Sequence, residues 1–354
     1  MKKTSIIILL VFLAFGAQPE IYSHEIPKER LVLVKTFPED GLPTKAVPWI
    51  DVDSNGNIYA VGNREHTIFK FNLEGKQLLT FGGWGQGPGE LQWPSKVSIE
   101  KESNQIFIKD NTGISIYDPE GRFIHKIRTF VPPISLCAVR SGVLLLQPAA
   151  DKKEMINFYD NQGKLISSFG EKYQANYALS KEIQPAYLDL MANNGKVLSD
   201  GKYIYYISYV FGEIQVFDFL GKSVMKKRIV GIKNLEKIRK DCEHLFFEGG
   251  IKRNKNGTVT ERVIFNDSYL ASGNIYLLML GYVEDGPYQI LSLSRDGRGI
   301  KERFLLPGGI QPENMTVINL AKEDGIRFIA SFCDKVNETN LIGIFKKEVT
   351  KGKE

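Results

Sequence analysis

The stretch FGGWGQGPGELQWPSKV, residues 81–97, lies between two strand-like segments, KQLLTF (76–81) and KVSIE (96–100). Five glycines are concentrated between residues 82 and 89, and glycine allows positive φ and tight turns that side chains would obstruct. Pro94 stands where the second strand would begin, and a missing N–H is tolerated there. No helix-start pattern follows the glycines, which argues against a phosphate cradle. The stretch therefore predicts a link between two all-β units.

Copies of those units recur along the chain. Each contains a short turn of glycine followed by Lys or Arg, at Gly75, Gly121, Gly163, Gly221 and Gly297. A strand-like run stands on each side of every turn, and another apolar run lies upstream, as in NIYAVG (57–62) and QIFIKD (105–110). A fourth run precedes these, as in WIDVD (49–53). The repeat predicts four strands per unit.

The first turn glycines are spaced as in a four-stranded propeller blade of about 40–50 residues. The later spacings are longer and require insertions at 173–195 and 234–250. In the second insertion Leu235, Ile238, Leu245 and Phe246 fall on one helical face. We expect both insertions to be short helical decorations on the ring.

The last unit lacks its fourth strand, and LVLVKTF (31–37) is the expected donor, pairing with LIGIFKK (341–347). Such closure protects sheet edges and locks a ring. The predicted fold is an all-β, six-bladed β-propeller of four-stranded blades, closed by the N-terminal strand. It forms one domain over residues 24–350, with blades near 47–81, 94–130, 134–170, 196–230, 263–306 and 315–348 plus 31–37.

One blade carries a family resemblance. Its sequence resembles a blade of an NHL-repeat six-bladed propeller, through the segments Gly56-Asn57-Ile58-Tyr59, Ile68-Phe69, Glu74-Gly75-Lys76 and FGGWGQGPGE. The resemblance is specific over residues 47–130 and weaker but regular to 348. More narrowly, the chain is similar to exported bacterial proteins described as six-bladed β-propellers. The resemblance implies the fold strongly and the function weakly.

The N-terminus resembles a secretory signal over residues 1–23, with Lys2 and Lys3 before the apolar run 5–17. The run is short for a membrane span of about 20 residues, although an uncleaved anchor is the alternative. We expect an exported protein, periplasmic, cell-surface or extracellular, with no transmembrane span after cleavage.

The net charge of +5 is small for 354 residues and the lysines are scattered, so no nucleic-acid surface is expected.

Three cysteines, Cys137, Cys242 and Cys333, cannot all pair within one chain. We interpret them as small buried residues, with one possible disulfide left open.

Asp51, Asp53 and Asn55 before Gly56 resemble the start of a calcium loop, but Gly62 stands where a carboxylate is needed. A turn is the preferred interpretation, and no metal ligands are assigned. A divalent cation such as calcium remains possible.

Propellers usually bind partners on the face where links between blades meet the loops between middle strands. On this face we expect Arg64, Glu65, His66, Trp84, Gln86, Asn111, Asp151, Lys152, Tyr209, Phe211, Glu284 and Asp285. From these we select as candidate partner-binding residues Arg64, His66, Trp84, Gln86, Asn111, Tyr209, Glu284 and Asp285. Two alternatives remain: Trp84 could fill space between blades, and His66 is expected to be a surface residue rather than a ligand.

The sequence carries no recognisable catalytic motif and has four histidines. The first hypothesis is therefore an exported, non-enzymatic, monomeric propeller that acts as a binding or assembly module for a protein, peptide or glycan. The alternative is a propeller hydrolase or lyase with a divalent cation at the central channel. A purely structural ring within a larger envelope assembly is a third possibility.

Overall fold

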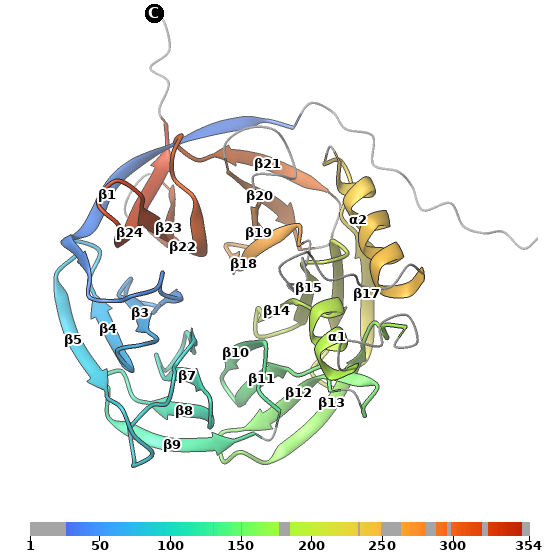
Figure 1. Cartoon of the computed structure of the whole chain (residues 1–354), viewed down its shortest axis with the longest axis horizontal. Coiled ribbons are helices and arrows are strands. Elements are labelled where there is room, and N and C mark those ends of the chain that lie inside the picture. Colours follow the sequence, from blue (N-terminus) through green and yellow to red (C-terminus); the bar gives the residue numbers. More distant parts are fainter. Residues whose placement is uncertain are drawn as a thin grey trace, which may run out of the picture.

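A computed structural model describes residues 26–129, 131–149, 151–176, 185–232, 234–248, 263–280, 288–295, 299–320 and 325–348. Its strands surround a central axis, with the sheets arranged like the blades of a propeller (Figure 1). The predicted secretory signal lies outside the described residues. Within these ranges, no helix is both long and apolar enough to cross a membrane.

Four sheets each contain four consecutive antiparallel strands, ordered from the axis outwards. The first contains β2 (Ile50–Val52), β3 (Ile58–Gly62), β4 (Thr67–Phe71) and β5 (Gln77–Gly82). The second contains β6 (Lys96–Ile99), β7 (Ile106–Asp110), β8 (Gly113–Tyr117) and β9 (Phe123–Arg128). The third contains β10 (Ser135–Val139), β11 (Gly142–Leu146), β12 (Glu154–Asp160) and β13 (Leu165–Glu171). The fourth contains β14 (Gly195–Ser199), β15 (Ile204–Ser208), β16 (Glu213–Phe217) and β17 (Ser223–Arg228).

The remaining strands form one eight-stranded sheet, which differs from the two separate blades that the sequence predicts. One half contains β18 (Phe265–Ala271), β19 (Asn274–Met279), β20 (Gln289–Ser294) and β21 (Ile300–Leu305). The other contains β22 (Pro312–Leu320), β23 (Gly325–Asp334) and β24 (Thr339–Lys347).

The two halves are joined by β1 (Lys28–Leu42), which is longer than the predicted strand 31–37. Residues 28–30 pair in parallel with β21, and the rest of β1 pairs antiparallel with β24, from Leu31 opposite Lys347 to Leu42 opposite Asn340. The N-terminal strand thus supplies the outer strand of the last blade and also continues onto the edge of the preceding one.

The burial pattern follows the position of each strand in its blade. Middle strands such as β3, β11 and β15 are buried at every residue, because neighbouring blades cover both faces of the sheet. Outer strands such as β5 and β17 alternate between half-buried and exposed residues, because their outer edge faces solvent. The continuous apolar runs of the sequence thus correspond to the buried middle strands, and the mixed runs correspond to the partly exposed outer strands.

The glycine of the repeated turn is required by the neighbouring blade as well as by the backbone. Gly75 and Gly221 both have positive φ, 80° and 81°. A Cβ placed on Gly75 would lie 2.7 Å from the Phe37 Cβ, and one placed on Gly221 would lie 2.7 Å from the Phe169 Cβ. Each of these two turns therefore receives an aromatic side chain from the outer strand of the preceding blade, whereas the turn at Gly163 receives Ile127.

The inner strands β2, β6, β10, β14, β18 and β22 contact one another in a closed circle around the axis. Side-chain oxygens on four inner strands accept the backbone N–H of the next inner strand. The pairs are Asp51 with Ile99 (2.8 Å), Ser98 with Ala138 (2.9 Å), Ser135 with Val197 (3.2 Å) and Asp267 with Met315 (2.9 Å). These bonds link the blades at the centre of the ring.

The segment 51–57 forms a turn rather than a calcium loop. One carboxylate oxygen of Asp53 accepts the backbone N–H groups of Asn55 and Asn57, at 2.9 and 2.8 Å. Its other oxygen accepts the Asn57 amide at 2.8 Å and the Tyr59 hydroxyl at 3.2 Å. Gly56 takes φ 87°, which only glycine adopts readily. The acidic residue is therefore a cap for the turn between β2 and β3.

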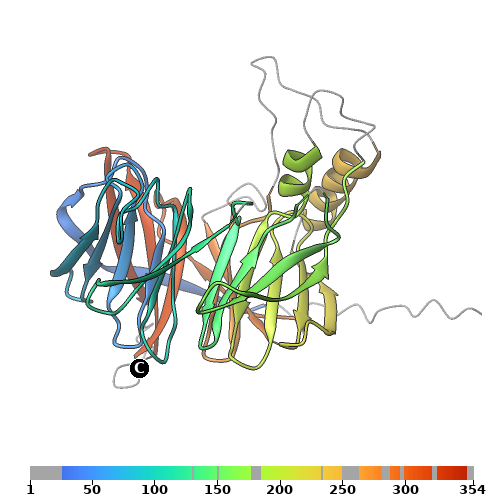
Figure 2. The ribbon, with the colours of Figure 1, turned by 90° about the horizontal axis from the view of Figure 1, so that it is seen from below.

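Two insertions carry helices, α1 (Pro185–Ala192) and α2 (Leu235–Glu243), the second continued by the π-helix η2 (His244–Glu248). Both helices project from one face of the ring (Figure 2). The α2 side chains Leu235, Ile238 and Cys242 and the η2 side chain Phe246 enter the largest apolar cluster. We call this side of the ring the helix-bearing face.

No disulfide joins the three cysteines, all of which lie within the described residues. Cys242 is buried on α2 and Cys137 is half-buried on β10, but Cys333 on β23 is exposed. The prediction that all three are small buried residues is therefore wrong for Cys333. Burial raises the pKa of the Cys137 thiol to about 12, so this group is an unreactive neutral thiol at ordinary pH.

Candidate binding face and ring axis

Three aromatic rings meet at the link between the first two blades. The His66 ring lies 4.3 Å from the Trp84 ring and 4.9 Å from the Trp93 ring, measured between centroids. The two tryptophan rings are 6.0 Å apart and nearly perpendicular, at 82°. We call His66, Trp84 and Trp93 the tryptophan cluster. The link that carries the cluster follows β5, the outer strand of its blade, and the two helices follow β13 and β17, the outer strands of theirs. The cluster therefore lies on the helix-bearing face.

The tryptophans are accessible while the histidine is not. Trp84 is 58% exposed and Trp93 is 43% exposed, whereas His66 is only 8% exposed. The prediction of His66 as a surface residue is therefore wrong, since two indole rings cover it. The alternative that Trp84 fills space between blades is also wrong, because more than half of its surface faces solvent.

Hydrogen bonds fix the histidine in place. The Trp93 backbone N–H donates to His66 Nδ1 at 3.1 Å, which assigns the ring proton of a neutral His66 to Nε2. The Gly83 N–H donates to the His66 carbonyl at 2.8 Å, and the Leu91 N–H donates to the Gly83 carbonyl at 2.8 Å. The cluster therefore lies on a loop that these backbone hydrogen bonds close.

Strained backbone accompanies this arrangement. His66 and Trp93 take positive φ values of 56° and 52°, a conformation that costs non-glycine residues about 1–3 kcal/mol. A Cβ on Gly85 would lie 1.9 Å from a carboxylate oxygen of Glu90, which also accepts the Gly87 N–H at 2.7 Å. The glycines therefore serve the geometry of a loop that presents two tryptophans.

The other candidates from this part of the sequence surround the cluster. Arg64 lies beside His66 in the turn between β3 and β4, Gln86 lies in the loop between the two tryptophans, and both are exposed. Asn111 is exposed too, and its backbone N–H donates to the Gln92 carbonyl at 2.8 Å, next to Trp93. Five of the eight predicted residues therefore belong to one stretch of the helix-bearing face.

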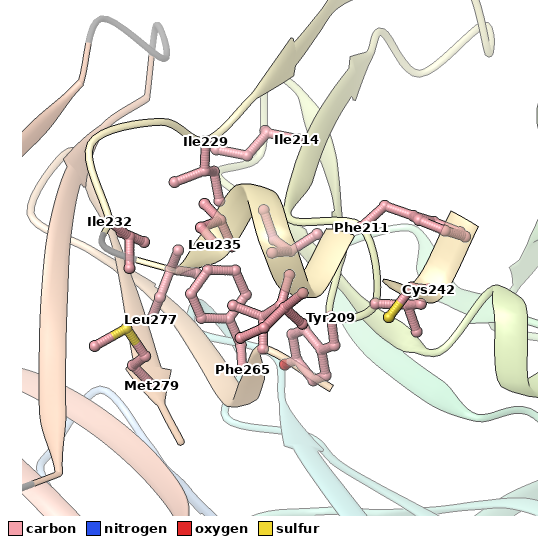
Figure 3. Close-up of a cluster of buried hydrophobic side chains, with 14 of the residues drawn as sticks. Tyr209, Phe211, Ile214, Ile229, Ile232, Leu235, Cys242, Phe265, Leu277 and Met279 are labelled. Atoms are coloured by element: carbon pink, nitrogen blue, oxygen red, sulfur yellow. The ribbon is translucent and has the colours of Figure 1, made fainter. Parts of the chain in front are cut away.

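The remaining candidates do not join this surface. Tyr209 is buried in the apolar cluster beneath α2 (Figure 3). Its hydroxyl lies 2.9 Å from the Ser268 hydroxyl. Phe211 is buried in the same cluster. The prediction that Tyr209 is a partner-binding residue is thus wrong, because the α2 insertion covers it. Glu284 and Asp285 lie outside the described residues.

A shallow polar groove lies over the third blade. Its volume is about 250 Å³, and it is lined by Asp151, Lys152, Lys153, Glu171, Lys172 and Gln174. Lys172 forms an ion pair with Asp189 of α1 at 2.5 Å, and its ammonium also donates to the Ala149 carbonyl at 2.6 Å. Two residues that the sequence placed on this face, Asp151 and Lys152, therefore border a groove distant in sequence from the tryptophan cluster.

Near the ring axis, the buried carboxylate of Asp51 accepts hydrogen bonds on both of its oxygens. One of its oxygens accepts the Val52 N–H at 2.8 Å, the Lys101 ammonium at 3.0 Å and the Tyr269 hydroxyl at 2.9 Å. Its second oxygen accepts the Ile99 N–H. Burial and the Asp51 carboxylate raise the pKa of Tyr269 to about 12, which keeps this hydroxyl protonated as a donor.

Asp267 repeats this arrangement on the fifth blade. One oxygen accepts the Ser268 N–H at 2.8 Å, the Lys196 ammonium at 2.7 Å and the Tyr209 hydroxyl at 3.4 Å. The other oxygen accepts the Met315 N–H at 2.9 Å. Burial raises the pKa of Tyr209 well above its usual value, so this hydroxyl too stays protonated.

These contacts bear on a possible cation. A divalent ion near the axis would have to replace ammonium, hydroxyl and amide donors on both carboxylates. Among the described residues, no group of three or more His, Cys, Asp and Glu side chains is positioned to hold a metal ion. The charged groups of the axis therefore act as links between blades.

Sequence reasoning missed Trp93 and the charged residues of the axis. Trp93 precedes Pro94, and only Pro94 is assigned a role from the sequence, at the start of a strand. Spacing alone could have found it, because both tryptophans lie in one glycine-rich link. The charged axis residues carry a weaker signal: Asp51 stands in an inner strand that is otherwise apolar, Ile50-Asp51-Val52, whereas Asp267 has polar neighbours, Asn266 and Ser268.

Residues 40–211, just under half of the chain, match the model of a family described as 6-bladed beta-propeller. One curated protein, "Protein brain tumor" of Drosophila melanogaster, is 22% identical over 126 residues. That match covers 34% of this chain and only 12% of the Drosophila protein.

Solved structures of propeller proteins extend the likeness to most of the chain. A putative exported protein from Bacteroides fragilis has a TM-score of 0.54 and 11% identity, covering 91% of this chain and 99% of that one. A catalytically inactive virginiamycin B lyase from Staphylococcus aureus, solved with Quinupristin, has a TM-score of 0.50 and 13% identity. It covers 90% of this chain and 100% of the lyase chain. At such identities the likeness shows the fold alone, and that fold is the β-propeller.

Proposed function

We propose that this protein is an exported, non-enzymatic propeller that binds a protein, peptide or glycan partner through its tryptophan cluster. Export rests on the signal-like pattern of residues 1–23. The binding role rests on one observation: Trp84 and Trp93 remain exposed on a hydrogen-bonded loop with His66 packed beneath them. Large, rigid aromatic side chains of this kind anchor partners at little entropic cost.

The polar surroundings support the same function. Arg64, Gln86 and Asn111 provide exposed donors and acceptors beside the indole rings. An apolar anchor within a polar rim is the usual composition of a reversible interface. The strain at His66 and Trp93 supports it further, since strained residues concentrate where function requires a fixed geometry.

Peptide and glycan arrays with the full-length protein test this proposal. We expect at least one probe class to bind, and the double variant Trp84→Ala/Trp93→Ala to weaken that binding by about 10-fold or more, as expected for anchor residues. Val224→Ala is the control, because Val224 is equally exposed at 53% but lies on β17 of the fourth blade. Binding unchanged in the double variant, or binding by no probe, would contradict the proposal.

An enzyme that uses a divalent cation at the axis is the alternative. Such an ion would need carboxylates from different blades, and the buried Asp51 and Asp267 are two, but the ion would have to displace the donors whose hydrogen bonds both already accept. Metal analysis of the purified protein separates the two functions. A stoichiometric metal, together with a lower melting temperature after chelation, would support the enzyme. Absence of both effects would leave the binding module as the better account.

A further inference from the structure

We propose that the tryptophan cluster binds an oligosaccharide, with one sugar ring stacked on the open side of Trp84. This inference rests on the binding role proposed above and names the class of partner. It is carried by groups that the protein leaves unused at this surface: one side of an indole, one ring nitrogen of His66, and the side-chain amides of Gln86, Gln92 and Asn111.

Trp84 presents an apolar platform. The His66 ring packs against one side of the indole, at 4.3 Å between centroids, while 58% of Trp84 stays exposed. The Trp93 ring stands at 82° to it and forms a wall beside it. One face of a pyranose ring carries C–H groups, which gain dispersion contacts over an aromatic face and are attracted by its negative quadrupole. Two indoles at a right angle therefore match the apolar side of a sugar.

The polar side of a sugar requires groups that both donate to and accept from hydroxyls, as an amide side chain does. Gln86 and Asn111 are exposed, and Gln92 is half-buried beside Trp93. Within the described residues, no hydrogen bond engages the side-chain amides of these three residues. The Asn111 N–H donates to the Gln92 carbonyl at 2.8 Å, so the backbone holds two of these residues together.

His66 adds a further donor. Its Nδ1 atom accepts the Trp93 N–H at 3.1 Å, so a neutral ring carries its proton on Nε2. Among the described residues none accepts from Nε2, and this atom is not sealed from solvent although only 8% of His66 is exposed. A nearly buried ring with an unused donor, packed against two indoles, suits a ligand that brings a hydroxyl oxygen.

The loop offers side chains rather than backbone groups, which favours a sugar over a peptide. Peptides that dock on aromatic residues pair their backbone with a free sheet edge or lie in a preformed groove. Here the Gly83 N–H donates to the His66 carbonyl, and the Leu91 N–H donates to the Gly83 carbonyl. A folded protein would bury about 800 Å² around an apolar core, whereas the exposed large apolar side chains of residues 81–97 are the two indoles alone.

Calorimetric titration of the full-length protein tests the assignment with cellohexaose, maltohexaose, chitohexaose and hexagalacturonate. We expect saturable binding of at least one of these hexasaccharides. Trp84→Leu keeps an apolar side chain but removes the aromatic face, and it should weaken binding about 10-fold or more. Trp84→Tyr keeps an aromatic face and should retain binding within about 3-fold. The double variant Gln86→Ala/Asn111→Ala should weaken binding about 3-fold to 10-fold, because hydrogen bonds to hydroxyls are lost.

A control variant and a second class of probe make the test specific. Gln162→Ala removes an exposed amide from the turn between β12 and β13 of the third blade, and it should change nothing. A proline-rich decapeptide represents peptide partners. If the decapeptide binds and no hexasaccharide does, the oligosaccharide assignment is overturned while the binding role of the cluster stands. Hexasaccharide binding that Trp84→Leu leaves unaltered would also overturn the assignment, and binding of no probe would remove both.

Discussion

At the scale of single residues, Gly75 combines two requirements that are usually separate. Its φ of 80° lies in the left-handed region, and a Cβ on it would meet the Phe37 side chain at 2.7 Å. Gly201 has nearly the same φ, 81°, but nothing lies within 4 Å of its missing Cβ. The two glycines therefore separate the cost of the backbone conformation from the cost of the close approach between blades.

We predict that Gly201→Ala lowers the free energy of unfolding by about 1–2 kcal/mol, the cost of a left-handed alanine. Gly75→Ala should cost about 1–3 kcal/mol more, because its methyl group must also displace Phe37. Urea unfolding followed by circular dichroism measures both values. Equal losses in the two variants would show that contact with Phe37 does not explain why glycine recurs in the turn.

The candidate site was predictable only where loop position decides it. His66, Trp84, Gln86 and Asn111 lie on the expected face, because the repeat fixes which loops meet there. Tyr209 has an equivalent loop position, yet it is buried, because the inserted α2 covers its blade. The sequence around Tyr209 does not predict this burial, because the burial depends on where a separate insertion packs.

At the scale of elements, α2 is held on the ring by one buried charge as well as by its apolar face. Arg239 is 1% exposed. Its guanidinium donates to the Phe211 carbonyl at 2.7 Å and to the Ile229 carbonyl at 2.9 Å, and it forms an ion pair with Glu236. The helix itself was predictable from its apolar spacing. The anchoring role of Arg239 was not, because arginine in an amphipathic helix usually marks the solvent side.

We predict that Arg239→Met loosens α2 without opening the ring. Two buried carbonyl groups would lose their donors, which costs about 2–4 kcal/mol. Hydrogen exchange should accelerate across Leu235–Glu243 and much less in β2–β9. Lys237→Met, an exposed position on the same helix, is the control and should leave exchange unchanged. Protection of α2 equal to that of the unaltered protein would contradict the anchoring role.

At the scale of the whole molecule, the N-terminal strand closes the ring with the same contact that joins neighbouring blades elsewhere. Phe37 of β1 packs on Gly75 as Phe169 of β13 packs on Gly221. Pairing of β1 with β24 was foreseeable, since LVLVKTF matches the other outer strands. Its continuation onto β21 was not, because residues 28–30 carry no apolar alternation that would mark a strand.

This equivalence predicts that closure strengthens the ring as much as an ordinary junction does. Phe37 is 3% exposed and Phe169 is 6% exposed, so Phe37→Ala and Phe169→Ala each remove a buried ring from a junction. Each should lower the free energy of unfolding by about 3–5 kcal/mol, within one cooperative transition. Calorimetry distinguishes the outcomes. If Phe37→Ala instead melts β1 in a separate, earlier transition, the N-terminal strand is an appendage, and the ring owes its stability to the other junctions.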